Sequence, residues 1–181
     1  EGKKTIGLEL AEQLGWELPD VIIYPTGGGT GLIGMWKVFG ELQRAGWISG
    51  ALPRMFTVQA AGCAPVVKSF AEGSDRCVPW PDPWTVASGL RVPGPLGDRL
   101  MLGALRQSGG GAIAVSDEAL GTEALAGNRL EGIDFAPEGG AAIAAARELR
   151  ATGVLSREDR VVLFNTGAGW LYRDPAELPR G

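Results

Sequence analysis

Histidine is absent from this sequence, and cysteine occurs only twice among its 181 residues. Without histidine, the chain supplies neither a Ser-His-Asp triad nor a His-ligated metal site of its own. Cys63 and Cys77 form no Cys-x-x-Cys pair and are too few for a disulfide framework, which favours free thiols and a cytoplasmic protein. With no histidine to activate it, Cys63 is expected to be a buried structural thiol.

Long apolar runs and an excess of basic residues are also missing. No run approaches the roughly 20 apolar residues that a membrane-spanning helix needs. The 17 Lys and Arg residues are outnumbered by 21 Asp and Glu residues, for a net charge of −4. Nucleic acids and anionic membranes attract clustered basic residues, so this balance argues against both as main partners.

What is present is a regular alternation of strand-like and helix-like segments. Short apolar strands are predicted at residues 21–24, 54–59, 112–115 and 161–164. Helices are predicted at residues 5–14, 32–45, 65–71, 97–107, 117–125 and 138–152, with Ser116 as a helix cap. Repeated strand–helix units with apolar strands predict an α/β fold: a doubly wound, mostly parallel sheet with helices on both faces, in three αβα layers.

Residues 73–95 interrupt this pattern. The stretch is dense in proline and tryptophan (VPWPDPWTVASGLRVPGP) and is predicted to be a long irregular connection that lines an active site or an interface. Trp80 and Trp84 either pack as anchors of this loop or wall the mouth of a site. Asp117, Glu118 and Glu138 fall at predicted helix starts, where the helix dipole accounts for acidic residues.

The most informative segment is residues 18–34, LPDVIIYPTGGGTGLIG. A predicted strand is followed by Pro25, by four glycines within five positions (Gly27, Gly28, Gly29 and Gly31) and by a predicted helix. Glycines tolerate positive φ and let a ligand approach the backbone, while a helix N-terminus offers free N–H groups and the positive end of a dipole. The segment therefore predicts a binding site for a phosphate group.

Four interpretations of this loop compete. A Walker A loop needs Lys and then Ser or Thr after its last glycine, but Leu32 and Ile33 follow here. The dinucleotide fingerprint GxGxxG is met by residues 29–34, although the next strand ends in Gln59 and Ala60 instead of the acid that binds ribose. A pyridoxal phosphate cup needs glycines in a row, as GGGTG provides. A tight turn without a ligand is the fourth interpretation, at an entropic cost for each glycine.

The chain resembles threonine synthases, which are fold-type II pyridoxal phosphate (PLP) enzymes of the tryptophan synthase beta-like superfamily. The resemblance rests on EGKKTIGLELAEQLGW, LPDVIIYPTGGGTGLIGMWKVFGEL and LPRMFTVQAAGCAPVVKSF, followed in order by SGGGAIAVSDEAL, EGIDFAPEGGAAIAAARELRATG and VVLFNTGAG. It implies that residues 1–181 are the carboxyl-terminal part of a PLP-binding catalytic domain whose upstream half is missing. A start at Glu1, in what looks like the middle of a helix, agrees with this expectation.

The resemblance also implies roles for particular residues. The loop that would bind the cofactor phosphate consists of Gly27, Gly28, Gly29, Thr30 and Gly31. Thr166, in LFNTGAG, would place a hydroxyl at the pyridine nitrogen; the alternative is a strand-end hydroxyl that satisfies a turn. The family's Schiff-base lysine lies upstream, so no catalytic residue is expected here. The chain's own lysines are expected near its start or on solvated helix faces; they are Lys3, Lys4, Lys37 and Lys68.

The implied enzyme is a PLP-dependent carbon–oxygen lyase that converts O-phosphohomoserine to threonine and phosphate, as in threonine biosynthesis. Residues 1–181 alone are expected to be inactive. The segment TVASGLRVPGPLGD departs from the AxAIxIG-type stretch of many threonine synthases. A PLP-dependent threonine or serine dehydratase, or a β-replacement enzyme, is therefore the alternative. From another class, a dinucleotide-binding module or a non-catalytic phosphate sensor is the alternative. We expect a small amino-acid substrate, no metal, no nucleic acid or membrane partner, and a homodimer as in many family members.

Overall fold

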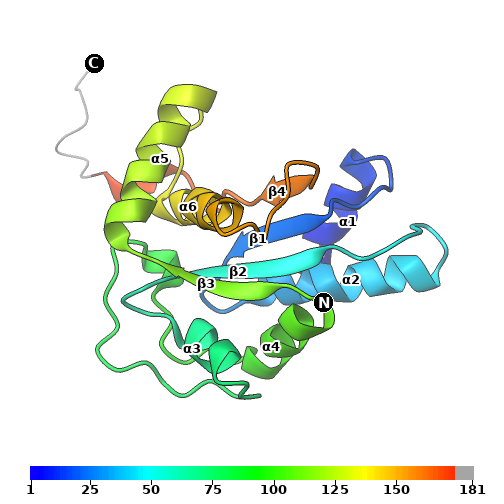
Figure 1. Cartoon of the computed structure of the whole chain (residues 1–181), viewed down its shortest axis with the longest axis horizontal. Coiled ribbons are helices and arrows are strands. Elements are labelled where there is room, and N and C mark those ends of the chain that lie inside the picture. Colours follow the sequence, from blue (N-terminus) through cyan, green and yellow to red (C-terminus); the bar gives the residue numbers. More distant parts are fainter. Residues whose placement is uncertain (174–181) are drawn as a thin grey trace.

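A four-stranded parallel sheet forms the centre of the computed structural model, which describes residues 1–173 (Figure 1). Its strands are β1 (Val21–Pro25), β2 (Arg54–Ala60), β3 (Gly111–Val115) and β4 (Val161–Leu163). They are ordered β3-β2-β1-β4 across the sheet. Ile23 of β1 is paired with Phe56 of β2 on one side and with Leu163 of β4 on the other.

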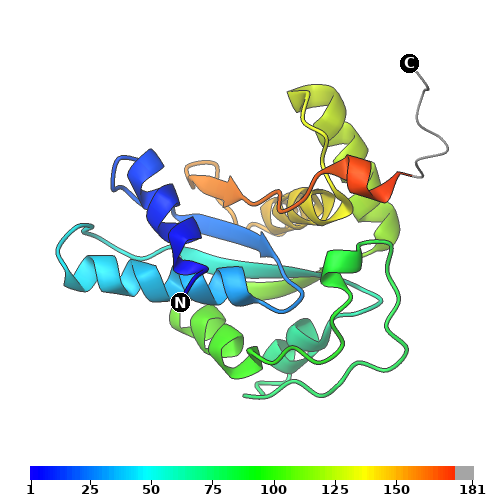
Figure 2. The same cartoon turned by 180° about the vertical axis from the view of Figure 1, so that it is seen from behind.

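Helices cover both faces of the sheet, which confirms the predicted α/β fold with three αβα layers. The helices are α1 (Lys4–Gln13), α2 (Thr30–Arg44), α3 (Pro65–Ala71), α4 (Asp98–Gln107), α5 (Asp117–Glu131) and α6 (Pro137–Ala151), with short 3₁₀ turns η1 (Ser88–Leu90) and η2 (Gly169–Tyr172). In Figure 1, α5 and α6 lie above the sheet and α2, α3 and α4 below it. Figure 2 shows α1 crossing α2.

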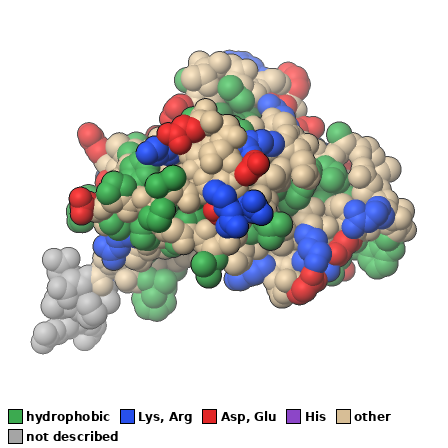
Figure 3. Space-filling view, turned by 90° about the horizontal axis from the view of Figure 1, so that it is seen from below, with side chains coloured by type: hydrophobic (Ala, Val, Ile, Leu, Met, Phe, Trp, Pro, Cys, Tyr) green, Lys and Arg blue, Asp and Glu red, His purple; other side chains and the backbone are tan. Residues whose placement is uncertain are grey.

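The strands are apolar because both of their faces are buried. Val21 and Ile23 of β1 contribute to the core beneath α5 and α6, whereas Ile22 contributes to the core formed with α1 to α4. Successive side chains of a strand point to opposite faces of the sheet, so a strand buried on both faces has no polar face, as is typical of parallel sheets. The face seen from below carries basic and acidic side chains interspersed, in line with the near balance of charges (Figure 3).

Most predicted elements are present with small differences at their ends. Ser116 caps α5 as predicted, since its Oγ accepts the N–H of Ala119 at 3.1 Å. The predicted end of that helix at residue 125 is wrong: α5 continues to Glu131 and stops at Gly132, whose φ is +67°. Among residues 1–173, no helix is long and apolar enough to cross a membrane.

The proline- and tryptophan-rich segment, residues 73–95, is irregular as predicted and contains only the turn η1. Trp84 is 62% exposed and so does not anchor the segment by packing, whereas Trp80 is half-buried. Cys63, which lies just beyond β2, is fully buried, and burial raises the pKa of its thiol. Its expected role as a buried structural thiol agrees with this environment.

Candidate anion site at the carboxyl edge of the sheet

The strand order places the glycine loop and Thr166 at the same edge of the sheet. From β1 the chain proceeds to β2 and β3 on one side, whereas β4 returns to the other side of β1. In such sheets, ligands bind beyond the carboxyl ends of the strands where the order reverses. The loop follows β1 and Thr166 follows β4, and the N–H of Phe164 extends their pairing by donating to the carbonyl of Ile23 at 3.2 Å.

The loop offers a row of unused hydrogen-bond donors. Within residues 1–173, the backbone N–H groups of residues 27–31 donate to no protein acceptor. Gly29 precedes α2 with a left-handed φ of +74°, and no side chain caps that helix. Gly28 and Thr30 are exposed. An anion could therefore accept hydrogen bonds here without displacing any existing one, and the dipole of α2 favours it.

Close packing behind the loop explains part of its glycine content. A Cβ atom on Gly29 would overlap Sδ of Met101 and lie 2.6 Å from its Cγ. A Cβ atom on Gly27 would overlap the carbonyl oxygen of Gly89 in η1. These two positions exclude any side chain, so the loop lies directly on α4 and on η1.

The hydroxyl of Tyr24 lies beside the first turn of α2. A Cβ atom on Gly31 would overlap this hydroxyl, so Gly31 makes room for it. Burial raises the pKa of Tyr24, which keeps the phenol neutral beside the loop. Tyr24 could not be predicted as a neighbour of the loop from the sequence, because an aromatic residue in a buried strand is normally a core residue.

Thr166 lies in a segment that packs against α6 while its own side chain stays exposed. A Cβ atom on Gly139 would overlap Oδ1 of Asn165, and one on Gly167 would lie 3.2 Å from the Cβ of Ala136. The Thr166 hydroxyl makes no hydrogen bond within the described chain, so it does not satisfy the turn after β4. The neighbours of Thr166 are thus closely packed, while Thr166 itself is exposed.

Three carboxylates that the sequence analysis attributed to helix dipoles, or left unassigned, bind the backbone of residues 73–95. Each belongs to the first turn of a helix: Asp98 to α4, Asp117 to α5 and Glu138 to α6. Their bonds are Cys77 N–H to Asp98 Oδ2 at 2.9 Å, Val86 N–H to Asp117 Oδ1 at 3.2 Å and Gly89 N–H to Glu138 Oε1 at 2.8 Å. Each bond holds the irregular segment at one point, and only the bond from Glu138 lies at η1.

Neither the chain's own lysines nor Gln59 hydrogen-bonds to residues 27–31 within the described chain, although Lys3, Lys4 and Lys37 line a cavity that Thr30 also lines. Lys4 is paired with Glu41 at 2.5 Å and Lys37 with Glu1, while Lys3 and Lys68 are exposed. Gln59 is fully buried; its Oε1 accepts the N–H groups of residues 66 and 67, and its Nε2 donates to the carbonyl of Thr26. Gln59 stands where a dinucleotide fingerprint needs an acid, and both its amide oxygen and its amide nitrogen are thus hydrogen-bonded to the backbone.

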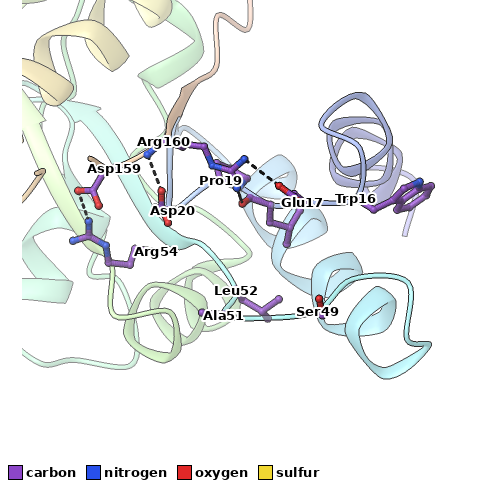
Figure 4. A pocket seen from close by; sticks show the side chains of 11 residues that line it. Trp16, Glu17, Pro19, Asp20, Ser49, Ala51, Leu52, Arg54, Asp159 and Arg160 are labelled. Atoms are coloured by element: carbon purple, nitrogen blue, oxygen red, sulfur yellow. Dashed lines mark hydrogen bonds and ion pairs between the residues drawn. The ribbon is translucent and has the colours of Figure 1, made fainter. Parts of the chain in front are cut away.

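A separate cavity of about 620 Å³ lies at the opposite, amino edge of the sheet (Figure 4). Arg54 there is paired with Asp159 at 2.9 Å, and the guanidinium of Arg160 lies 3.8 Å from Glu17. Both arginines already face carboxylates, so the cavity offers an anion less free positive charge than its arginines suggest. Among residues 1–173, no cluster of His, Cys, Asp and Glu suited to a metal ion is found.

The structure is an α/β fold whose glycine loop lies at the point where the strand order reverses, which is where such folds commonly bind anionic ligands. Residues 1–167 match the family model described as pyridoxal-phosphate dependent enzyme, and the chain belongs to this family. The predicted cofactor, PLP, is the cofactor of that family, and the unused N–H groups of the loop fit its phosphate.

The curated relatives of this chain include threonine synthases. The threonine synthase of Methanosarcina acetivorans is 38% identical over 175 residues, which are 97% of this chain and 42% of that protein. The threonine synthase of Methanocaldococcus jannaschii is 35% identical, with the same coverage of 97% and 42%. The chain therefore spans less than half the length of the curated relatives that it matches.

Solved structures of other members share the fold. A threonine deaminase from T.th. is 25% identical with a TM-score of 0.66, over 88% of this chain and 54% of that one. A fungal L-serine ammonia-lyase from Rhizomucor miehei is 26% identical with a TM-score of 0.73, over 92% of this chain and 51% of that one.

Proposed function

We propose that this chain is the cofactor-binding part of a PLP-dependent lyase that converts O-phosphohomoserine to threonine and phosphate. The observation that supports it most is the row of unused N–H groups at residues 27–31, in a chain whose curated relatives are named threonine synthases. In the reaction, the phosphate ester is eliminated from the γ-carbon and water is added at the β-carbon. When bound, PLP supplies the electron sink for this chemistry.

The glycine loop binds the cofactor phosphate in this proposal. The N–H groups of Gly27, Gly28, Gly29, Thr30 and Gly31 donate to phosphate oxygens, with the hydroxyl of Thr30 as a further donor. The left-handed φ of Gly29 is one that only glycine adopts at low cost, and it sets the loop at the start of α2. The loop thereby fixes one end of the cofactor.

Thr166 faces the other end of the cofactor in this proposal. Its hydroxyl donates a hydrogen bond to the pyridine nitrogen, and a hydroxyl, unlike a carboxylate, leaves that nitrogen largely unprotonated. Neither the glycine loop nor Thr166 provides the lysine that binds the cofactor covalently. That lysine comes from a part of the protein outside these 181 residues, and we propose that residues 1–181 form the carboxyl-terminal part of its catalytic domain.

A PLP-dependent threonine or serine dehydratase is the second candidate. The similarity of fold to a threonine deaminase and to an L-serine ammonia-lyase favours it, as does the segment around η1, which departs from the threonine synthase pattern. The dinucleotide-binding alternative loses support, because the place of its acid is taken by Gln59, whose amide is already engaged.

The test is to express the whole protein with PLP and to identify its products from O-phosphohomoserine, threonine, serine and O-acetylserine in parallel. Threonine and inorganic phosphate in equal amounts from O-phosphohomoserine support the proposal. Ammonia and a 2-oxo acid from threonine or serine, without phosphate release from O-phosphohomoserine, support the dehydratase. We also propose a cytoplasmic homodimer, which sedimentation of the whole protein and cell fractionation would test.

A further inference from the structure

One buried carboxylate joins two segments that are far apart in the sequence. Glu138, in the first turn of α6, is only 5% exposed. Its Oε1 accepts the N–H of Gly89 at 2.8 Å and also the hydroxyl of Tyr172. That hydroxyl lies 2.9 Å from Oγ of Ser88. Burying a carboxylate is costly unless hydrogen bonds compensate, so the bonds of Glu138 are needed to keep it there.

Both joined segments border the candidate site. Gly89 donates its N–H to Glu138, and its carbonyl oxygen lies against Gly27, the first glycine of the loop. Tyr172 belongs to η2, which ends the segment that carries Thr166 after β4. Figure 2 shows the green segment with η1 and the red turn η2 on the same side of the molecule. Glu138 thus contacts the neighbour of the glycine loop and the end of the Thr166 segment.

We infer that Glu138 is a positioning residue for cofactor binding: it holds Gly89 against Gly27 and so maintains the shape of the phosphate loop. In this role it acts through the backbone of Gly89. Without its carboxylate, the N–H of Gly89 loses its acceptor, η1 moves away from Gly27, and the loop loses the surface on which it rests. Asp98 makes the same kind of bond to the same irregular segment, but at Cys77, far along the chain from Gly89.

This inference rests on the proposed phosphate-binding role of the loop, so its first test uses no cofactor. Hydrogen exchange of the whole protein without PLP is followed by mass spectrometry in peptides that cover Ser88 to Leu90. Glu138→Ala should speed exchange there about tenfold, as expected when a buried hydrogen bond to a charged group is lost. Glu138→Gln, which keeps an acceptor, should restore most of the protection. Asp98→Ala is the matched control and should speed exchange around Cys77 and Arg99, but not at Ser88 to Leu90.

The second test measures the dissociation constant of PLP in the same variants by cofactor absorbance. Glu138→Ala should weaken PLP binding about tenfold, whereas Glu138→Gln and Asp98→Ala should stay within about threefold of the wild type. Unchanged exchange at Ser88 to Leu90 in Glu138→Ala would overturn the inference. So would faster exchange with unaltered PLP affinity, because the bond would then exist without shaping the loop.

The proposed function and the role of Glu138 can be refuted separately. If the wild-type whole protein does not bind PLP, the proposed function fails and the inference falls with it, whatever the exchange data show. If the wild type binds PLP and Glu138→Ala binds it equally well, only the inference fails. Should Glu138→Ala not fold, Glu138→Gln compared with Glu138→Leu, which fills the same space without an acceptor, decides the point by the same two measurements.

Discussion

Replacing Gly29 with alanine tests the geometry of the phosphate loop directly. Gly29 has a left-handed φ of +74°, which costs about 1–2 kcal/mol for an L-residue with a side chain. Its new Cβ would also lie 2.6 Å from Cγ of Met101 and overlap the sulfur, and overpacking of this kind costs about 1–3 kcal/mol. We therefore expect Gly29→Ala to lower the free energy of unfolding by about 2–5 kcal/mol, a large part of the roughly 5–15 kcal/mol of a typical domain.

The neighbouring glycine provides a matched control. A Cβ atom on Gly28 would meet no heavy atom within 4 Å, and its φ is not positive. Gly28→Ala should therefore change the free energy of unfolding by no more than about 0.5 kcal/mol. Urea denaturation of the cofactor-free protein, followed by circular dichroism, measures both variants under the same conditions.

A double variant separates the steric cost from the backbone cost. Met101→Ala alone should cost about 2–5 kcal/mol, because it leaves a cavity at a fully buried position. When Met101→Ala is combined with Gly29→Ala, the loss of unfolding free energy should be about 1–3 kcal/mol smaller than the sum of the two single losses, because the shorter side chain relieves the overlap with the new Cβ atom. Strict additivity, or a Gly29→Ala variant as stable as Gly28→Ala, would refute the described packing of the loop on α4.

Three further predictions concern Thr166, Tyr172 and Asp98. The hydroxyl of Thr166 makes no hydrogen bond within the described residues, so Thr166→Ala should change the free energy of unfolding by no more than about 0.5 kcal/mol. The same variant should lower kcat of the PLP-loaded whole protein about tenfold or more, whereas Thr166→Ser should stay close to the wild type. Burial and the hydrogen bond to Glu138 raise the pKa of Tyr172 above its usual 10.0. Tyr172→Phe should lower the free energy of unfolding by about 0.5–1 kcal/mol at neutral pH. Denaturation at increasing pH should show this difference fading above pH 10, as the wild-type phenol ionises. Burial acts to raise the pKa of Asp98, but the N–H groups of Cys77 and Arg99 and the charge of Arg76 outweigh it and hold the pKa below its usual 3.8. Asp98→Asn should therefore cost about 1–3 kcal/mol at pH 7, and denaturation at decreasing pH should show this cost fading below pH 3.8, as the pH falls through the lowered pKa of wild-type Asp98.

The sheet and most helices could be predicted because their signals are local. Val21 to Tyr24 are apolar and end at a proline, and Pro65 marks a helix start at the position where its missing N–H costs nothing. The end of α5 could not be predicted in this way. Ala126, Gly127 and Asn128 resemble a helix stop, but a Cβ atom on Gly127 would lie 3.0 Å from Phe135 and Ile143, so this glycine serves close packing against neighbouring residues.

The candidate site was predictable where the backbone itself forms it. Successive glycines between a strand and a helix indicate an anion site whatever the tertiary structure around them. The parts formed by side chains distant in sequence were not predictable. Glu138 at a helix start is explained by the dipole alone, and only the fold brings it to Gly89 and Tyr172. Tyr24 similarly looks like a core residue until its hydroxyl is seen beside Gly31.

The central claim is that residues 27–31 bind the cofactor phosphate and that Thr166 faces the pyridine ring. A crystal structure of the whole protein with PLP tests it most directly. We expect phosphate oxygens within hydrogen-bond distance of the loop N–H groups and the Thr166 hydroxyl beside the ring nitrogen. A PLP phosphate bound elsewhere, for example beside Arg54 and Arg160 at the amino edge, with the loop left free, would contradict it.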